Sequence, residues 1–267
     1  MRYLAAMIFT LLVPSAARAA LVTRDVDYQQ GETALQGYLA YDDAVKGKRP
    51  GVMIVHEWWG VNDYVKGRVR QLADLGYVAF CADIYGKGVR ATTMQEAQQA
   101  SAPFRTDRAL LRARARAGLE VLRKHELVDP KRIAAIGYCF GGMTVLELAR
   151  SGADVAGVVS FHGGLGTPNP EDAKNIKAKV LVLHGGDDPN VPPEQVLAFQ
   201  DEMRKAKVDW QMVIYGGAVH SFTNPASGND PSRGAAYNEK ADQRSWEAMR
   251  VFFAEIFRER EPWRSGT

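Results

Sequence analysis

Residues 137–142 read GYCFGG and place a cysteine between glycines, directly after a short apolar run at residues 133–136. A strand, a sharp glycine turn and a helix in this order form a nucleophile elbow, G-x-S-x-G, with cysteine here in the place of serine. Glycine is needed because so sharp a turn brings backbones too close for side chains. Cys139 then lies at a helix N-terminus, where free N–H groups and the helix dipole favour a thiolate. The motif predicts Cys139 as a nucleophile and the Phe140 N–H as an oxyanion donor.

Other residues capable of acid–base chemistry also follow predicted strands. The carboxyl ends of parallel strands meet at one edge of a sheet, and α/β proteins bind their ligands there. The residues that follow strands are His56 and Glu57, then Cys139, His162, His184, Asp187, Asp188 and His220. Acidic residues and a histidine therefore come after the cysteine. This is the order nucleophile, acid, base of the α/β-hydrolases.

These residue types suit acyl transfer through a covalent intermediate. A thiolate attacks a carbonyl carbon and forms an acyl-enzyme. His220 would protonate the leaving group and then activate water for deacylation. A carboxylate, from Asp187 or Asp188, would hold the imidazole in the correct tautomer and stabilise its charged form. The sequence predicts a Cys-His-Asp triad.

The elements that must position these residues alternate between strand and helix. Residues 22–28 and 35–41 alternate apolar and polar positions, which predicts an antiparallel hairpin. Continuous apolar runs predict buried strands at residues 52–55, 77–81, 133–136, 155–161, 180–183 and 211–215. Helical periodicity is found at residues 65–75, 106–123, 143–150, 194–207 and 239–258. The pattern predicts the α/β class and an α/β-hydrolase fold: a mostly parallel twisted sheet with helices on both faces and an N-terminal antiparallel hairpin.

The first 19 residues have the features of a secretory signal peptide. A basic start precedes an apolar run at residues 4–13, and Ala17-Arg18-Ala19 supplies the small residues of a cleavage site. Ten apolar residues are too few to span a bilayer. We expect cleavage after Ala19, export to the periplasm or secretion, and a single domain over residues 20–267; an uncleaved N-terminal anchor is the alternative.

The charge and cysteine content exclude some classes of function. A net charge of +3 in 267 residues gives no electrostatic footprint for nucleic acid, and the arginines at residues 108–123 read as a solvated helix face. Cys81 and Cys139 are the two cysteines, and a disulfide between them is an alternative to a free nucleophile. A second alternative is a metal site, with His56, His162, His184 and His220 converging as ligands. Neither C-x-x-C nor H-E-x-x-H spacing occurs, so we expect no metal and no cofactor.

The chain resembles the dienelactone hydrolase family, the cysteine-dependent branch of the α/β-hydrolases. Five segments carry the resemblance, in family order over nearly the whole chain after the signal peptide. They are residues 56–62 (HEWWGVN), 82–85 (ADIY), 137–142 (GYCFGG), 185–192 (GGDDPNVP) and 218–222 (AVHSF). The resemblance implies hydrolysis of a lactone or small carboxylic ester.

The resemblance also implies roles for single residues. Cys139 would be the nucleophile, His220 the base, and Asp188, four residues before Pro192, the acid of the triad. Glu57 matches a family glutamate that accepts the thiol proton when substrate arrives. The N–H groups of Trp58 and Phe140 would form the oxyanion hole.

One departure from the family concerns the substrate. The founding enzymes hold a substrate carboxylate with two arginines, and this chain has Lys87 and Asn224 at those positions. Lysine supplies charge but not a bidentate fork, and Arg90 is a possible substitute. Trp58, Trp59 and Phe222 indicate either an apolar or aromatic acyl pocket or ordinary core packing.

Three further alternatives stay open from the sequence. Cys139 can be an inert buried cysteine, since cysteine is among the most buried residue types. The protein can be a non-catalytic exported binding protein on the same scaffold. The cysteine can also serve thiol exchange or acyl transfer to an acceptor other than water. The expected partner is a small-molecule ester or lactone, with no nucleic acid and no membrane after signal cleavage.

Overall fold

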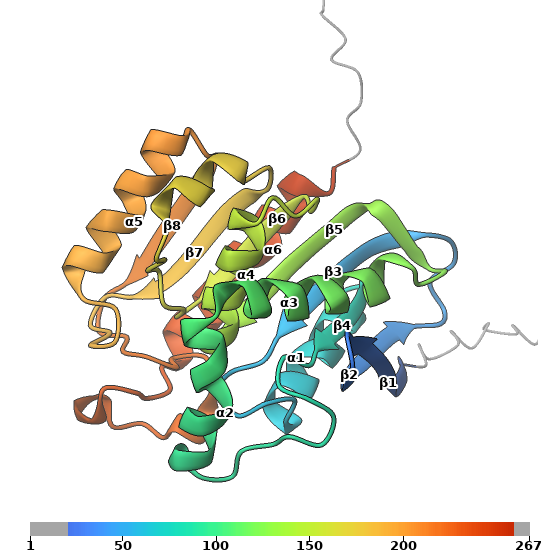
Figure 1. The fold of residues 1–267 in the computed structure, drawn as a ribbon, viewed down its shortest axis with the longest axis horizontal. Coiled ribbons are helices and arrows are strands. Elements are labelled where there is room, and N and C mark those ends of the chain that lie inside the picture. Colours follow the sequence, from blue (N-terminus) through green and yellow to red (C-terminus); the bar gives the residue numbers. More distant parts are fainter. Residues whose placement is uncertain (1–20, 259–267) are drawn as a thin grey trace, which may run out of the picture.

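One twisted sheet forms the centre of the molecule (Figure 1). The structure, a computed structural model, describes residues 21–258. The strands in this range are β1 (Leu21–Gln30), β2 (Thr33–Asp42), β3 (Arg49–Val55), β4 (Val78–Ala82), β5 (Val128–Tyr138), β6 (Gly157–Phe161), β7 (Lys179–Gly185) and β8 (Trp210–Tyr215). Each predicted strand is present, with its ends shifted by a few residues.

The strand order is β1-β2-β4-β3-β5-β6-β7-β8. β1 pairs with β2 and β2 with β4 in antiparallel fashion, and all other neighbours are parallel. The predicted N-terminal hairpin and mostly parallel sheet are therefore confirmed. The carboxyl ends of β3, β5, β6 and β7 lie at one edge because these strands run in the same direction.

Helices cover both faces of the sheet, as predicted. They are α1 (Asp63–Asp74), α2 (Met94–Thr106), α3 (Arg108–Arg123), α4 (Phe140–Arg150), α5 (Pro193–Ala206) and α6 (Glu239–Ile256), with short 3-10 turns η1 (Pro170–Asn175), η2 (Pro225–Ser227) and η3 (Pro231–Arg233). One core cluster joins the sheet to α3, α4 and α5, and the other joins it to α1 and α6. The alternation of side chains along each strand supplies both clusters.

Helix α2 is absent from the predicted elements. Its N-terminus has a capping box, in which Thr93 accepts from the Glu96 amide and Glu96 reaches back to the cap. Pro103 lies inside the helix, and Asp107 ends α2 and caps α3, so the helix predicted to start at residue 106 begins at Arg108. The polar composition and the proline concealed α2, although the Thr-x-x-Glu spacing marks its start.

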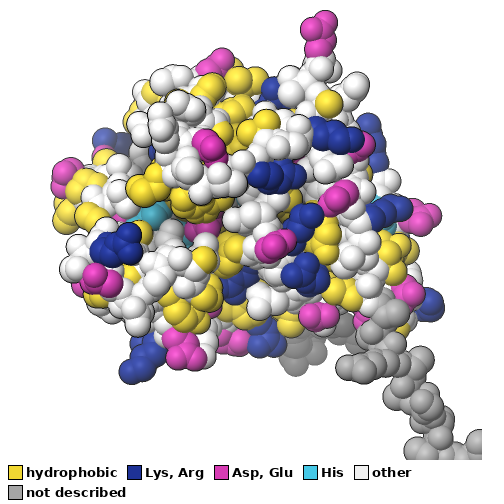
Figure 2. Space-filling view, turned by 90° about the horizontal axis from the view of Figure 1, so that it is seen from below, with side chains coloured by type: hydrophobic (Ala, Val, Ile, Leu, Met, Phe, Trp, Pro, Cys, Tyr) yellow, Lys and Arg dark blue, Asp and Glu magenta, His cyan; other side chains and the backbone are white. Residues whose placement is uncertain are grey.

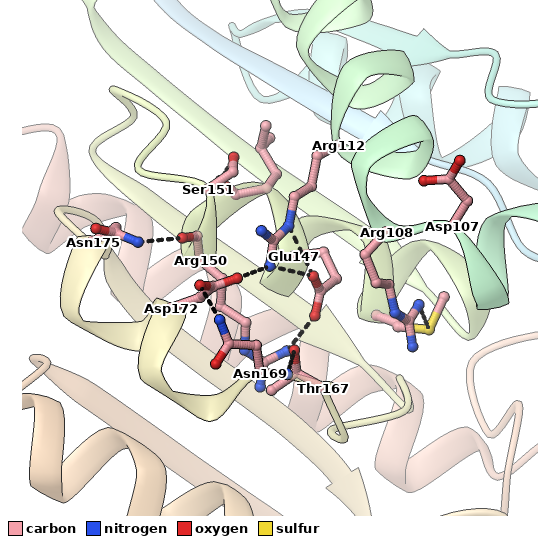
Figure 3. A network of polar contacts seen from close by, with 12 residues as sticks. Asp107, Arg108, Arg112, Glu147, Arg150, Ser151, Thr167, Asn169, Asp172 and Asn175 are labelled. Atoms are coloured by element: carbon pink, nitrogen blue, oxygen red, sulfur yellow. Dashed lines mark hydrogen bonds and ion pairs between the residues drawn. The ribbon is translucent and has the colours of Figure 1, made fainter.

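A buried ion network anchors α4, the helix that begins after the elbow (Figure 3). Arg150 is 1 % exposed and binds Glu202 through Nε and Nη2, at 2.7 and 2.8 Å, and Glu147 through Nη1 at 3.0 Å. Arg112 of α3 bridges Glu147 to Asp172 of η1, each at 2.7 Å. Charges removed from water need such complete pairing. The network fixes α4 against α3, α5 and η1.

Two sequence expectations concern membranes and export. None of the helices within residues 21–258 has an apolar stretch long enough to cross a bilayer. The predicted signal peptide, residues 1–19, lies outside the described residues.

Candidate active site

Cys139 occupies a strained turn between β5 and α4. Its φ of 53° lies in the left-handed region that non-glycine residues rarely adopt. The glycines around it are sterically required, because a Cβ on Gly137 would lie 2.0 Å from the Gly141 carbonyl oxygen. A Cβ on Gly141 would lie 2.2 Å from the Val55 carbonyl oxygen. The close approach of the three segments is the geometry of the predicted elbow.

The structure brings Cys139, His220 and Asp188 into one chain of contacts. His220 Nε2 lies 3.0 Å from Cys139 Sγ, and His220 Nδ1 lies 2.8 Å from Asp188 Oδ2. The Asp188 side chain is fully buried and also accepts from the Asn190 amide at 2.8 Å. Asp187 is exposed. Of the two acids left open by the residue types, Asp188 is the one that reaches the imidazole.

The surroundings of His220 favour its charged form. Burial of the ring opposes protonation, but the adjacent Cys139 thiolate and Asp188 carboxylate outweigh it and raise the pKa of His220 well above its ordinary value. Charge on Cys139 and Asp188 is thus what the imidazole of His220 responds to. Cys139 itself is 9 % exposed and lines a pocket.

Glu57 follows β3 and lies behind the pocket wall. Its carboxylate accepts hydrogen bonds from Asn224 Nδ2 at 2.7 Å and from Ser221 Oγ at 3.3 Å. Burial raises the pKa of Glu57, while Asn224 and the charge at His220 act against the rise. Asn224 stands where the founding enzymes of the family have an arginine. Its hydrogen bond to Glu57 therefore comes from a neutral amide. The role of Glu57 as proton acceptor stays a prediction.

The two residues predicted to form the oxyanion hole line the same pocket as Cys139. Phe140 is the first residue of α4. Trp58 lies in the loop after β3, where its carbonyl oxygen accepts from the Tyr85 hydroxyl at 3.1 Å. His56 supports this loop, because its Nδ1 donates to the Glu57 carbonyl oxygen at 2.5 Å and its Nε2 accepts from the Ile84 amide at 3.2 Å.

The pocket has a volume of about 940 Å³. It opens on the face seen in Figure 2, which is hollowed and shows histidine atoms between hydrophobic side chains. Apolar lining comes from Trp58, Trp59 and Met143, whereas Phe222 is fully buried and belongs to the core. The suggestion that Phe222 lines an acyl pocket is therefore wrong.

Two positively charged side chains that the sequence analysis did not single out line the pocket. Arg105 of α2 and Arg233 of η3 line it, and Lys87 and Arg90 do not. Lys87 instead pairs with Asp27 at 2.6 Å on the hairpin. Arg90 donates to the Val89 carbonyl oxygen at 2.8 Å. The candidate carboxylate anchors Lys87 and Arg90 therefore do not line the pocket, although Ala91, the next residue, does.

The histidines considered as metal ligands have separate partners. Within residues 21–258, no group of three or more histidine, cysteine or acidic side chains is arranged to hold a metal ion. His162 contacts the Cys139 amide and Thr223, and His220 contacts Cys139 and Asp188. Cys81 and Cys139 are both free, so the alternative disulfide is wrong.

The chain is similar to solved structures, among them two that share more than 40 % of its residues. The protein named m3DLH is 45 % identical, with a TM-score of 0.86, over 90 % of this chain and all of its own. A second structure is described as a dienelactone hydrolase-like promiscuous phosphotriesterase, P91, from metagenomic libraries. It is 44 % identical, with a TM-score of 0.86, over the same shares of both chains.

Comparison with families and curated proteins agrees with the structures. A protein of Saccharolobus solfataricus, provisionally named a carboxymethylenebutenolidase, is 26 % identical over 87 % of this chain and 98 % of its own length. The model of the dienelactone hydrolase family matches residues 35–257, which include the whole candidate site. The chain is a hydrolase and belongs to the dienelactone hydrolase family.

Proposed function

We propose that this protein hydrolyses a lactone or small carboxylic ester through an acyl-enzyme on Cys139. The observation that carries the proposal is the unbroken contact chain from Cys139 Sγ, in the lining of the pocket, through His220 to Asp188. These are the residue types and the spatial order of a nucleophile, a base and its orienting acid.

Acylation begins with the thiolate of Cys139. Its sulfur attacks the carbonyl carbon of the ester and forms the C–S bond of a tetrahedral intermediate. The intermediate collapses by breaking the bond from carbon to the leaving oxygen. The imidazolium of His220, 3.0 Å from the sulfur, gives its Nε2 proton to that oxygen. A lactone leaves its alcohol tethered to the acyl group.

The amides of Trp58 and Phe140 stabilise the negative oxygen of the intermediate in this proposal. Both residues line the pocket beside Cys139, and the Phe140 amide adds the positive end of the α4 dipole. One well-placed donor of this kind is worth about 3–4 kcal/mol of barrier height.

Deacylation uses water as the nucleophile. Neutral His220 accepts a proton from water at Nε2 while the water oxygen attacks the thioester carbonyl. The carbon–sulfur bond breaks, and the Cys139 thiolate forms again beside imidazolium. Asp188 keeps the other ring nitrogen protonated and stabilises the charged ring, at an Nδ1–Oδ2 distance of 2.8 Å.

Glu57 has an auxiliary role in this proposal. Glu57 accepts the proton of Cys139 in those protein molecules whose cysteine is still a neutral thiol when substrate binds. Support comes from burial, which raises the pKa of Glu57, and from its electrostatic coupling to His220. Asn224 and Ser221 supply the hydrogen bonds that keep the carboxylate in place.

The lining of the pocket indicates an acyl group with an apolar or aromatic portion. Trp58 and Trp59 pack edge to face, with ring centroids 5.2 Å apart, and both line the pocket. Rings of this size bury large apolar area against a ligand. The founding family's pair of arginines is not matched, so we do not assign a dienelactone as the substrate.

A panel of nitrophenyl esters and small lactones tests the proposal. We expect a burst of nitrophenol equal to the enzyme concentration, followed by slower turnover, and loss of both phases in Cys139→Ala. Full turnover by Cys139→Ala would overturn the covalent mechanism. Turnover absent from the wild-type protein on every substrate would favour the non-catalytic binding protein. Predominant acyl transfer to added amines or alcohols would favour a transferase.

A second candidate activity is hydrolysis of phosphotriesters. The observation that favours it is the 44 % identity over 90 % of this chain to a promiscuous phosphotriesterase of the same family. The Cys139 thiolate would displace nitrophenol from phosphorus as it would from a carbonyl carbon. Release of nitrophenol from a diethyl nitrophenyl phosphate, absent in Cys139→Ala, would support this activity.

We also propose that the protein works outside the cytoplasm after removal of residues 1–19. Support comes from the basic start, the short apolar run and the small residues before position 20. Mass measurement of the protein purified from its native cell fractions tests this. A mature N-terminus at Ala20 is expected, and an intact Met1 in the cytoplasmic fraction would contradict it.

A further inference from the structure

His162 is a buried histidine that the proposed reaction does not use. It directly follows β6, is fully buried, and has a φ of 39°. A residue other than glycine is strained in this left-handed region, and such strain persists where the surroundings fix the residue. Its own amide donates to the Leu183 carbonyl oxygen at 2.9 Å. The backbone thus aims the imidazole toward the site.

The hydrogen bonds of His162 define its tautomer. The Cys139 amide is shared between the Phe161 carbonyl oxygen, at 3.0 Å, and His162 Nδ1, at 3.1 Å. An amide only donates, so Nδ1 carries no proton and the ring proton is on Nε2. Nε2 then donates to Thr223 Oγ1 at 2.7 Å. Both ring nitrogens are satisfied only when His162 is neutral.

The two hydrogen bonds of His162 form a bridge from the Cys139 amide to Thr223. Thr223 is itself held in place by several contacts. It is fully buried and lies three residues after His220, in the loop that carries the proposed base. Its hydroxyl lies 2.6 Å from the Tyr64 hydroxyl, and its carbonyl oxygen accepts from Arg68 Nη2 at 2.7 Å. Arg68 in turn pairs with Asp242 of α6 at 2.6 Å. Helices α1 and α6 thereby fix the far end of the bridge.

His162 also touches the base directly. Its ring meets that of His220 edge to face, with centroids 5.4 Å apart, and meets that of Phe222 at 5.1 Å. A second imidazolium at this distance would repel a charged His220. Burial, together with the charge at His220, lowers the pKa of His162 well below its ordinary value, in agreement with the tautomer.

We propose that His162 is a positioning residue, a neutral imidazole that ties the amide of Cys139 to the His220 loop and so fixes the distance between sulfur and base. The proposal rests on the proposed cysteine mechanism. Proton exchange between Sγ and Nε2 requires hydrogen-bond distance, and a misplacement of about 1 Å in such a pair costs up to about 100-fold in rate.

Two variants remove the bridge in different ways. His162→Phe keeps a ring of similar shape and loses both nitrogens, and Thr223→Val keeps the shape of Thr223 and loses the hydroxyl. We expect kcat to fall about 10- to 100-fold in His162→Phe, and in the same direction but less in Thr223→Val, with KM within about 2-fold. The double variant should match His162→Phe, because both changes break one bridge.

Rescue and a stability control separate positioning from structural damage. His162→Asn can place its amide oxygen near the position of Nδ1, and asparagine tolerates positive φ, so it should recover part of kcat. Leu72→Ala, on the buried face of α1, should lower Tm and leave kcat unchanged. A further readout is the pH profile of Cys139 alkylation by iodoacetamide, which should change shape in His162→Phe and Thr223→Val and not in Leu72→Ala.

The outcomes are distinguishable. Lowered kcat with a changed alkylation profile in either bridge variant supports the proposal. Wild-type kcat and alkylation in folded Thr223→Val and His162→Phe would overturn it, while inactive Cys139→Ala keeps the proposed function intact. Full ester turnover by Cys139→Ala would instead remove the proposed function. If His162→Phe does not fold, the near-isosteric Thr223→Val and the Asn variant decide the matter.

Discussion

The imidazole Nε2 of His220 lies 3.0 Å from the sulfur of Cys139. The opposite ring nitrogen lies 2.8 Å from Asp188 Oδ2, so the ring cannot turn without losing a buried contact. The proposed mechanism has a thiolate and an imidazolium as its resting pair, and the charges of Cys139 and Asp188, which raise the pKa of His220 against the effect of burial, support it. Reactivity of the sulfur therefore depends on the ring beside it.

The first prediction concerns the two thiols. Cys139 lines the pocket, while Cys81 is fully buried and burial raises the pKa of its thiol. One equivalent of iodoacetamide should react rapidly, at Cys139. His220→Gln should slow this reaction by about 100-fold at about pH 6, where an ordinary thiol is less than about 1 % thiolate. Peptide mapping at several pH values measures both effects. Equal rates in the two proteins would contradict the ion pair.

The adjacent acids form a matched pair of variants. Asp188→Asn should keep the fold and lower kcat by about 10³- to 10⁴-fold, because the amide supports the wrong imidazole tautomer. Asp187→Asn should retain kcat within about 2-fold, since that side chain is exposed. Steady-state kinetics with a nitrophenyl ester compare them. A larger loss of kcat in Asp187→Asn than in Asp188→Asn would show that Asp187, and not Asp188, is the acid of the triad.

Glu57 predicts a pH dependence of stability. Burial raises its pKa, so the folded protein holds this proton more tightly than the unfolded chain, whose value is near 4.5. Stability is therefore lost as the pH rises from about 4.5 through the raised value. Glu57→Gln escapes this loss, and its Tm relative to wild type should rise between about pH 4 and pH 7.5.

A second glutamate gives the control for Glu57. The Lys174 ammonium beside the exposed Glu171 lowers the pKa of that carboxyl. The contribution of Glu171 to stability therefore increases as the pH rises, opposite to that of Glu57. Glu171→Gln should lose Tm slightly, relative to wild type, over the same rise in pH. If the Tm of Glu57→Gln relative to wild type fell as the pH rose, the pKa of Glu57 would not be raised by burial, and the prediction would be wrong.

The ion network behind α4 predicts a large loss of stability. Arg150→Met leaves Glu202 buried without its cation and leaves Glu147 with Arg112 alone, which should cost about 3–5 kcal/mol in urea unfolding. The control is Arg250→Met, which breaks the exposed pair with Glu247 and should cost less than about 1 kcal/mol. Equal losses in the two variants would show that the network does not stabilise the fold.

Most of the fold could be predicted because its signals are local. The apolar run at residues 52–55 gives β3, and the glycines around Cys139 give the elbow whose close contacts the structure displays. β5 extends back to Val128, which pairs with Arg49, and a register shift places the polar residues 129–132 between this pair and the apolar run that starts at Ile133. Cys139, Asp188 and His220 could be named because each follows a strand.

The rest of the site depends on loops that periodicity does not describe. Arg105 comes from a helix hidden by Pro103, and Arg233 from a 3-10 turn of three residues. His162 was visible only as a histidine after a strand, and its partner Thr223 carries no sequence signal. Their roles arise from tertiary contacts between segments about 60 residues apart.

The most direct test is a mass measurement on the quenched reaction. The protein is mixed with an activated ester, acidified within the burst, and digested for peptide mapping. The peptide that contains Cys139 is predicted to gain the mass of the acyl group, with no adduct in Cys139→Ala and a longer-lived one in His220→Gln. An acyl group found on another residue, or burst turnover with Cys139 unmodified, would contradict the cysteine mechanism.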